Sequence, residues 1–209
     1  MRCAKKHTLQ RERSKENTMS RIEIIDPTGE WKAEYVSYAS AIRSVIGDLA
    51  VRIDHIGSTS VEGLPAKDII DIQMTVSHLE DPSIIALLTK VGYVYRREMT
   101  HDNLVGVEAT SPELRKVYFE EPPGERRMHL HIRELGRLNQ RYPLVFRDFL
   151  RSNVRVRQAY AAIKRELAAR FPNDVNAYYA IKDPYMDTIY EAALVWATSS
   201  NWRPDTEFL

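Results

Sequence analysis

Apolar and polar residues alternate along the chain in a way that predicts both helices and strands. Apolar side chains recur at helical spacing over residues 31–49, behind an Asp26-Pro27 pair of the kind that starts a helix. Residues 51–56 and 69–76 are rich in β-branched side chains and predict two strands. We therefore expect a sheet with helices packed against it.

The rest of the chain divides into a strand-rich middle and a helical end. Asp81-Pro82 should begin a helix that Gly92 ends. Further strands are predicted at 93–95, 104–109, 115–120 and 127–132, the last two forming a hairpin. Helices are predicted at 142–152, 154–171 and 174–197, with a break or kink at Pro184. The expected class is α/β (α+β), a mixed sheet with flanking helices and a helical C-terminal third.

Composition agrees with one domain that buries a substantial core. Of the 209 residues 44% are hydrophobic, and 30 basic against 29 acidic residues leave a net charge of +1, which gives no reason to expect nucleic acid as a partner. The first twenty residues are basic and lack periodicity. We expect a disordered basic tail at 1–20, a single domain at 21–198 whose helical part begins near 142, and a C-terminal tail at 199–209.

Cysteine usage and hydropathy bear on location. Cys3 is the only cysteine, which excludes an intrachain disulfide and fits a reducing compartment. No apolar run approaches the roughly 20 residues that span a bilayer. The expectation is a cytoplasmic protein with no membrane partner.

The segment 55–60, His-Ile-Gly-Ser-Thr-Ser, predicts a phosphate-binding turn. Gly57 lets the backbone approach a phosphate, Ser58 adds a hydroxyl donor, and a short helix from Thr59 would direct free N–H groups at the anion. A plain turn between two strands is the alternative explanation.

Asp71 lies on the second predicted strand, where a period of two puts Ile69, Asp71 and Gln73 on one face. A carboxylate that leaves a buried sheet needs a cation or hydrogen bonds. Asp71 is therefore a candidate metal ligand and catalytic residue. The alternative is a solvated aspartate at a strand edge.

His129 and His131 share one face of a predicted strand, and the hairpin brings Lys116, Tyr118 and Glu120 near them. Two imidazoles and a carboxylate are metal-ligand material. We predict that the histidines act as ligand, general base or substrate contact, and that Glu120 is a metal ligand. A polar strand face with internal hydrogen bonds is the alternative.

Basic residues recur on the predicted C-terminal helices. Arg147 and Arg151 are four residues apart, so they share a helical face and suit a triphosphate. Lys164 and Lys182 lie on the next two helices. If these helices face the Gly-Ser turn, the four residues would hold phosphates; otherwise they are ordinary surface charges.

Together these motifs resemble the GrpB family of the nucleotidyltransferase superfamily over about residues 22–196. The stretches that carry the resemblance are 55–64, 69–72, 129–131, 146–151 and 160–164, with the spaced Tyr178 and Lys182. The resemblance implies a polymerase-β-like nucleotidyltransferase fold that binds a nucleoside triphosphate such as ATP with Mg²⁺ (or Mn²⁺) and a small-molecule acceptor. Phosphate would lie at Ser58, metal at Asp71, and the acceptor near His129 or His131.

The chain departs from the superfamily pattern at Gln73. Such enzymes generally carry two acids one residue apart, and here the second is a neutral amide, which weakens a two-metal site. Either Glu108, Glu120 or the histidines complete a one-metal site, or catalysis has been lost and binding remains.

Three functions therefore stay open. The first is a metal-dependent transferase of a nucleotidyl or other activated group, which would release pyrophosphate. The second is a non-catalytic nucleotide or phosphometabolite sensor, which would bind without turnover. The third is a metal-dependent hydrolase using His129, His131 and Asp71, whose activity a chelator would remove in the absence of any nucleotide.

Overall fold

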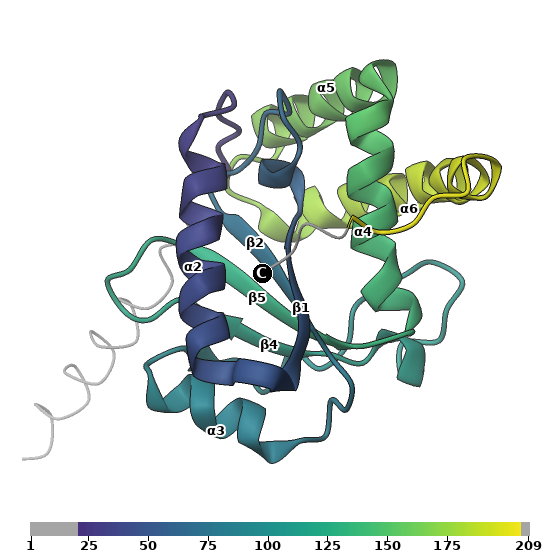
Figure 1. Ribbon diagram of the computed structural model, residues 1–209. Helices are drawn as coiled ribbons and strands as arrows, with labels where there is room; N and C mark the ends of the chain where they lie inside the picture. Colours follow the sequence, from purple (N-terminus) through teal and green to yellow (C-terminus); the bar gives the residue numbers. More distant parts are fainter. Residues whose placement is uncertain (1–20, 206–209) are drawn as a thin grey trace, which may run out of the picture.

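A five-stranded mixed sheet lies at the centre of the structure, a computed structural model that describes residues 21–205 (Figure 1). The strands are Ala50–Ile56 (β1), Ile70–Val76 (β2), Val94–Tyr95 (β3), Val117–Glu120 (β4) and Met128–Glu134 (β5). Their order is β1-β2-β5-β4-β3; β2 and β5 run parallel and the other pairs antiparallel. The expected tail at 1–20 lies outside the described residues, as do 206–209.

Two helices cover one face of the sheet. They are Glu30–Ile46 (α2) and Pro82–Lys90 (α3). Ile42 and Leu88 from these helices pack against Ile70, Ile72 and Met74 of β2 in one buried cluster. Burying a large aliphatic side chain stabilises a fold by about 1.5–3 kcal/mol, so this layer forms the main core.

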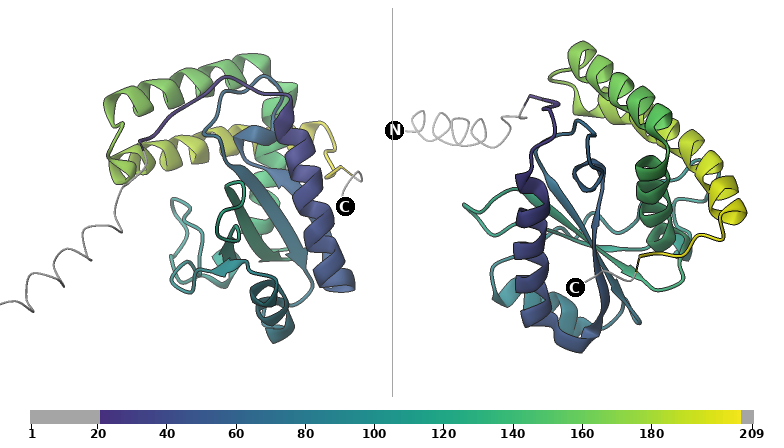
Figure 2. Two further views of the ribbon diagram at one scale, coloured as in Figure 1. Left: turned by 90° about the vertical axis from the view of Figure 1, so that its left-hand side faces the viewer. Right: turned by 45° about the horizontal axis from the view of Figure 1, so that its top comes forward.

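Three helices form the second layer, over the opposite face. They are Leu138–Ser152 (α4), Val154–Arg170 (α5) and Val175–Ser199 (α6). Figure 2 shows α5 and α6 lying side by side over one end of the sheet, with α4 beside β1. Short 3₁₀ turns lie at Gly47–Leu49, Ser58–Ser60 and Pro112–Leu114. The fold class expected from the sequence, an α+β fold with a helical C-terminal part, is confirmed.

Several predicted boundaries were wrong, for identifiable reasons. The first helix starts at Glu30, because Ile25 still pairs in extended conformation with Ala66. Residues 104–109 form turns and not a strand. Helix α4 begins at Leu138, whose backbone N–H donates to the Glu113 carboxylate (2.9 Å), a distant contact that local spacing does not reveal.

The last helix runs through Pro184 without a break, since buried Tyr178 and Ile189 anchor it on both sides. Within the segment expected as a C-terminal tail, Trp202 packs against the protein and donates its indole N–H to Asp148 (3.1 Å). No helix of residues 21–205 is long and apolar enough to cross a membrane.

Candidate functional site

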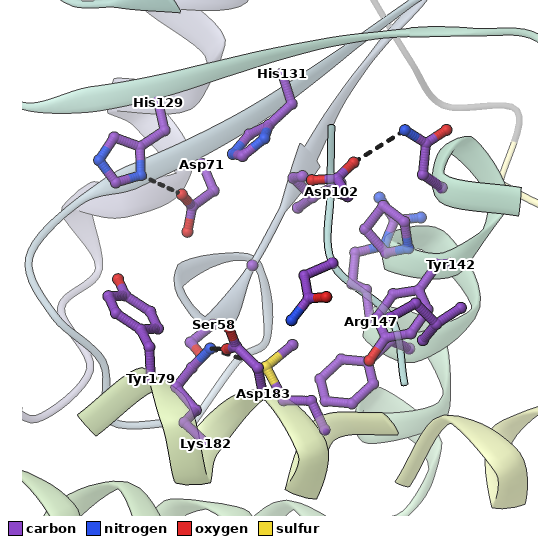
Figure 3. A pocket seen from close by; sticks show the side chains of 18 of the residues that line it. Ser58, Asp71, Asp102, His129, His131, Tyr142, Arg147, Tyr179, Lys182 and Asp183 are labelled. Carbon is purple, nitrogen blue, oxygen red and sulfur yellow. Dashed lines mark hydrogen bonds and ion pairs between the residues drawn. The ribbon is translucent and has the colours of Figure 1, made fainter. Parts of the chain in front are cut away.

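A cavity of about 530 Å³ lies between the helical layer and the face of the sheet that carries Asp71, Tyr118 and His129 (Figure 3). Residues from the Gly-Ser turn, β2, β4, β5, the 99–104 loop, α4, α5 and α6 line it. The ionisable acidic and basic side chains along it are Lys67, Asp71, His101, Asp102, Lys116, His129, His131, Arg133, Arg147, Lys164, Lys182, Asp183 and Asp187.

The parallel pairing of β2 and β5 brings Asp71 and the two histidines together. Asp71 lies opposite His129 in the ladder, and Gln73 lies opposite His131. Nδ1 of His129 is 3.0 Å from Oδ1 of Asp71. One potential ligand atom from each of Asp71, His129 and His131 lies within 4.8 Å of the other two, so these side chains can share one cation.

The pKa values of Asp71 and His131 are both lowered from their ordinary values. Burial opposes ionisation of Asp71, but the hydrogen bond and charge of His129 lower its pKa to about 2. Burial and the charges of Arg133 and Lys116 lower the pKa of His131 well below its ordinary value. At neutral pH the carboxylate is ionised and His131 is neutral, which are the protonation states that metal binding requires.

The hydrogen bonds distinguish the two imidazoles. Nδ1 of His129 faces a carboxylate acceptor and so carries a proton, which leaves Nε2 as the ring nitrogen through which His129 could bind a cation. Nδ1 of His131 faces a guanidinium nitrogen of Arg133 at 3.3 Å. Because arginine only donates, Nε2 of His131 carries the proton in this arrangement, and His131 must shift it before ligating through that atom.

Gly57 has a role that the sequence did not reveal. Its φ is +70°, and a Cβ atom there would lie 2.3 Å from Oδ2 of Asp71. The absence of a side chain therefore makes room for the Asp71 carboxylate itself. The expected short helix after it is a 3₁₀ turn at Ser58–Ser60, whose first N–H groups have no acceptor within the turn.

Lys164 reaches the Gly-Ser turn from α5. Its Nζ donates to Oγ of Ser58 (2.9 Å) and to the carbonyl oxygen of Pro65. The residue is only 2% exposed. Burial, with the repulsion of Lys182, lowers the pKa of Lys164 to about 7. The expected proximity of this lysine to Ser58 is present.

Lys67 and Tyr179 join Lys182 on the same wall and were not predicted. Lys67 donates to the Tyr179 hydroxyl, and the Lys182 ammonium lies 5.2 Å from the centre of the Tyr179 ring. Burial lowers the pKa of Lys67 to about 8, against the attraction of Asp71. Figure 3 shows Tyr179 and Lys182 rising from α6 on the side of the pocket opposite His129. Lys67 lies in an irregular connector, so no periodic pattern marks it.

Gln73 belongs to a separate buried network. Its Oε1 accepts from Arg133 (2.8 Å), and its Nε2 donates to the carbonyl oxygen of Gln140 (2.9 Å). Arg133 also pairs with Asp102, which accepts from Lys116 (2.7 Å) as well. These charges lower the pKa of Asp102 far below its ordinary value, although burial acts in the opposite direction. At the strand position where a nucleotidyltransferase would carry its second acid, the Gln73 amide therefore accepts a hydrogen bond from the Arg133 guanidinium.

Arg147 lines the cavity and Arg151 does not, and both make contacts within the protein. Arg147 is 5% exposed; its guanidinium donates to the carbonyl oxygen of His55 (2.9 Å) and to Asp148 (2.7 Å). Arg151 donates to the carbonyl oxygen of Ser60 (2.8 Å) and does not line the cavity. Both side chains attach α4 to the back of the Gly-Ser turn.

The side chains of Thr59, Glu120 and Glu108 form contacts with other residues of the protein. The Thr59 hydroxyl lies 3.0 Å from Nε2 of His55 and donates to the carbonyl oxygen of Ile69. Glu120 lies opposite His129 in the sheet, but its carboxylate faces Arg96 (3.6 Å) and does not line the cavity. Glu108 accepts from Thr110 in an exposed turn.

Comparison with known proteins places this geometry in a family. A model of the GrpB protein family matches residues 21–192. The chain belongs to the GrpB family. The crystal structure of the conserved protein GrpB from Enterococcus faecalis superposes with a TM-score of 0.69 at 27% identity, covering 84% of this chain and 99% of that one.

Curated proteins with two different names are similar in sequence to this chain. The UPF0157 protein PA4798 of Pseudomonas aeruginosa is 34% identical over 83% of this chain and 68% of its own length. A protein named dephospho-CoA kinase from Mycolicibacterium paratuberculosis is 32% identical over 88% of this chain and 48% of its own length. The chain thus spans about half the length of the kinases it matches.

Proposed function

We propose that this GrpB protein binds a nucleoside triphosphate with one divalent cation and transfers its nucleotidyl, or another activated group, to a small-molecule acceptor. The observation that carries the proposal is the position of the Asp71, His129 and His131 cluster, which faces a wall of lysines across one cavity. In this view the fold is a nucleotidyltransferase-like one that has kept a single acidic ligand.

The donor set fits a divalent cation and favours Mn²⁺ over Mg²⁺. Mg²⁺ prefers oxygen ligands, whereas imidazole nitrogen suits the transition metals. Asp71 and His129 would hold the ion first, and His131 would join after its contact with Arg133 is released. When bound, the cation would neutralise charge on phosphate oxygens.

Ser58, Lys67, Lys164 and Lys182 would bind the phosphates. The ammonium groups of the three lysines repel one another, and the hydroxyl groups of Ser58 and Tyr179 lie in the same region. A tri- or diphosphate relieves that repulsion better than a single phosphate does. The acceptor oxygen would attack the α-phosphorus and pyrophosphate would leave, with catalysis resting on positioning and charge neutralisation.

A metal-dependent phosphoester hydrolase is the second candidate. It is favoured by the Gln73 contact with Arg133, which puts positive charge where a two-metal transferase would hold its second acid. In that case water replaces the acceptor, and the same phosphate wall binds the ester.

The test is to incubate the protein with each common nucleoside triphosphate and Mn²⁺ or Mg²⁺, with and without candidate acceptors, and to measure pyrophosphate and orthophosphate separately. The transferase predicts metal-dependent pyrophosphate release. Orthophosphate release, or release from phosphoesters without nucleotide, would favour the hydrolase. Saturable binding without either product would leave a sensor and contradict both enzymatic proposals.

A further inference from the structure

A second region of the same cavity lies away from the metal cluster and from the lysines of the proposed phosphate site. Its walls are apolar and aromatic, formed by Leu104, Tyr142, Phe146 and Met186. Figure 3 shows Tyr142 on the opposite side of the pocket from His129. The ligand that fills the cavity must therefore present a different chemistry to each end.

Asp187 places a carboxylate in this region that has no ion pair among the described residues; the Lys182 ammonium reaches the edge of the region at Sδ of Met186 (2.9 Å). Its Oδ1 accepts from the Tyr142 hydroxyl and its Oδ2 from the backbone N–H of Val105, both at 3.0 Å. Both donors are neutral, and within residues 21–205 no lysine, arginine or histidine forms an ion pair with Asp187. The cavity's other carboxylates do have basic neighbours: Asp71 has His129, Asp102 has Arg133 and Lys116, and Asp183 has Lys182.

Asn139, one helical turn before Tyr142, adds an acceptor that lacks a donor. Its Nδ2 donates to Asp102 (3.0 Å) and to the carbonyl oxygen of Arg115 (2.9 Å), which fixes the orientation of the amide. Its Oδ1 is then left buried with no partner among the described residues, although Asn139 is 3% exposed and lines the cavity. Buried acceptors normally have a donor, so the wall of the cavity contains an acceptor whose donor is missing among the described residues.

We propose that this region, formed by Leu104, Asn139, Tyr142, Met186 and Asp187, is a subsite for a cationic, amine-bearing group on an apolar carbon body. The Asp187 carboxylate, held in place by the Tyr142 hydroxyl, would pair with the ammonium. The side chains of Leu104 and Met186 would cover the carbon body.

The cavity is then bipolar, with lysines at the metal end and a carboxylate at the amine end. A molecule that carries both an amine and a hydroxyl would be held by its amine at Asp187 and could extend toward the phosphate end. The assignment of the hydroxyl of such a molecule as the transfer acceptor rests on the proposed function. The binding of an amine at Asp187 does not.

The test uses benzylamine and benzyl alcohol, which share an apolar body and differ in charge. The full chain, labelled at its methionine methyl groups, is titrated in an amine-free buffer and followed by NMR. Benzylamine should shift the Met186 signal at millimolar concentration and leave the core residue Met128 unchanged, while benzyl alcohol should bind much more weakly. Equal binding of both compounds, shifts elsewhere only, or no shift with either would overturn the proposal, and none of these outcomes depends on a variant.

Asp187→Asn keeps the shape of the side chain and removes its charge. It should weaken benzylamine about tenfold or more and leave benzyl alcohol unchanged. The matched control is Asp183→Asn, one turn earlier on α6 and already paired with Lys182, which should leave benzylamine affinity unchanged. Equal affinities of Asp187→Asn and the unmodified protein would contradict the subsite.

Repeating the titration with Mg²⁺ and ATP separates the two proposals. If amine binding persists but nucleotide and metal have no effect on the protein, the proposed transferase fails while the amine subsite stands. If nucleotide binds but the amine does not, the reverse holds.

Discussion

At the scale of single residues, the site depends on hydrogen bonds and ion pairs between a few charged side chains that line the cavity. Asp71 and its candidate role follow from strand periodicity, and the pairing with His129 follows from the parallel register. Lys67 and Asp102 could not be predicted, because both lie in irregular connections where spacing carries no information. The contact of Gln73 with Arg133 was also hidden, since it depends on which strands are neighbours.

Gly57→Ala tests whether the glycine makes room for Asp71. The new Cβ would lie 2.3 Å from Oδ2 of Asp71, so the carboxylate must move and metal-dependent binding should fall. Gly63→Ala is the matched control, with a similar positive φ (+75°) and nothing within 4 Å of the added atom. Calorimetry and thermal unfolding of both variants separate backbone strain from the clash. Equal losses of ligand binding in the two variants would show that the clash does not matter.

The pH dependence of stability should report Lys164. Its pKa is about 7 in the folded protein against 10.5 ordinarily, so between these values the unfolded chain binds a proton that the folded protein does not. The contribution of this lysine to the free energy of unfolding therefore rises with pH from about 7 to about 10.5, and is least favourable below 7.

Lys164→Met should remove this rise, as measured by urea unfolding at about pH 6.5 and about pH 9. The exposed Lys90→Met serves as control and should keep it. An unchanged difference between the two pH values in Lys164→Met would contradict the assignment.

At the scale of elements, α4 is the part that holds the Gly-Ser turn in place. Arg147 and Arg151 bind the backbone carbonyl groups of His55 and Ser60, and of the two only Arg147 also lines the cavity. Helical spacing placed both on one face, as expected. That face packs against β1 and the Gly-Ser turn. An amphipathic pattern shows which side of a helix is buried, but it does not show which element that side packs against.

Arg147→Met should therefore destabilise the protein by about 3 kcal/mol, since it removes the donor to a buried carbonyl and one of the basic partners of Asp148 and Asp54, which keep Arg151 and Arg52. Arg151→Met, at a side chain that is 40% exposed, should cost less than about 1 kcal/mol. Denaturant unfolding measures both. Full stability of Arg147→Met with lost nucleotide binding would instead support the phosphate-binding role that the sequence favoured.

At the scale of the whole molecule, the cavity forms between the sheet and the layer of helices α4, α5 and α6. The strands at 50–56 and 70–76, the hairpin and the helical end were predictable from periodicity and turns. The order of the strands was not, because the parallel pairing of β2 and β5 joins segments more than fifty residues apart. The site exists only where that pairing faces α5 and α6, so its full set of residues needed the tertiary structure.

The central claim is that one cation binds at Asp71 and bridges to a triphosphate. Its most direct measurement is calorimetric titration of the protein with ATP, in the presence and absence of Mn²⁺, for Asp71→Asn and for Glu120→Gln. Asp71→Asn should abolish the metal-dependent part of ATP binding with little loss of fold, because the amide keeps the shape but not the charge. Glu120→Gln should change nothing, since that side chain faces Arg96. Metal-dependent binding that survives Asp71→Asn, or disappears in Glu120→Gln, would contradict the account.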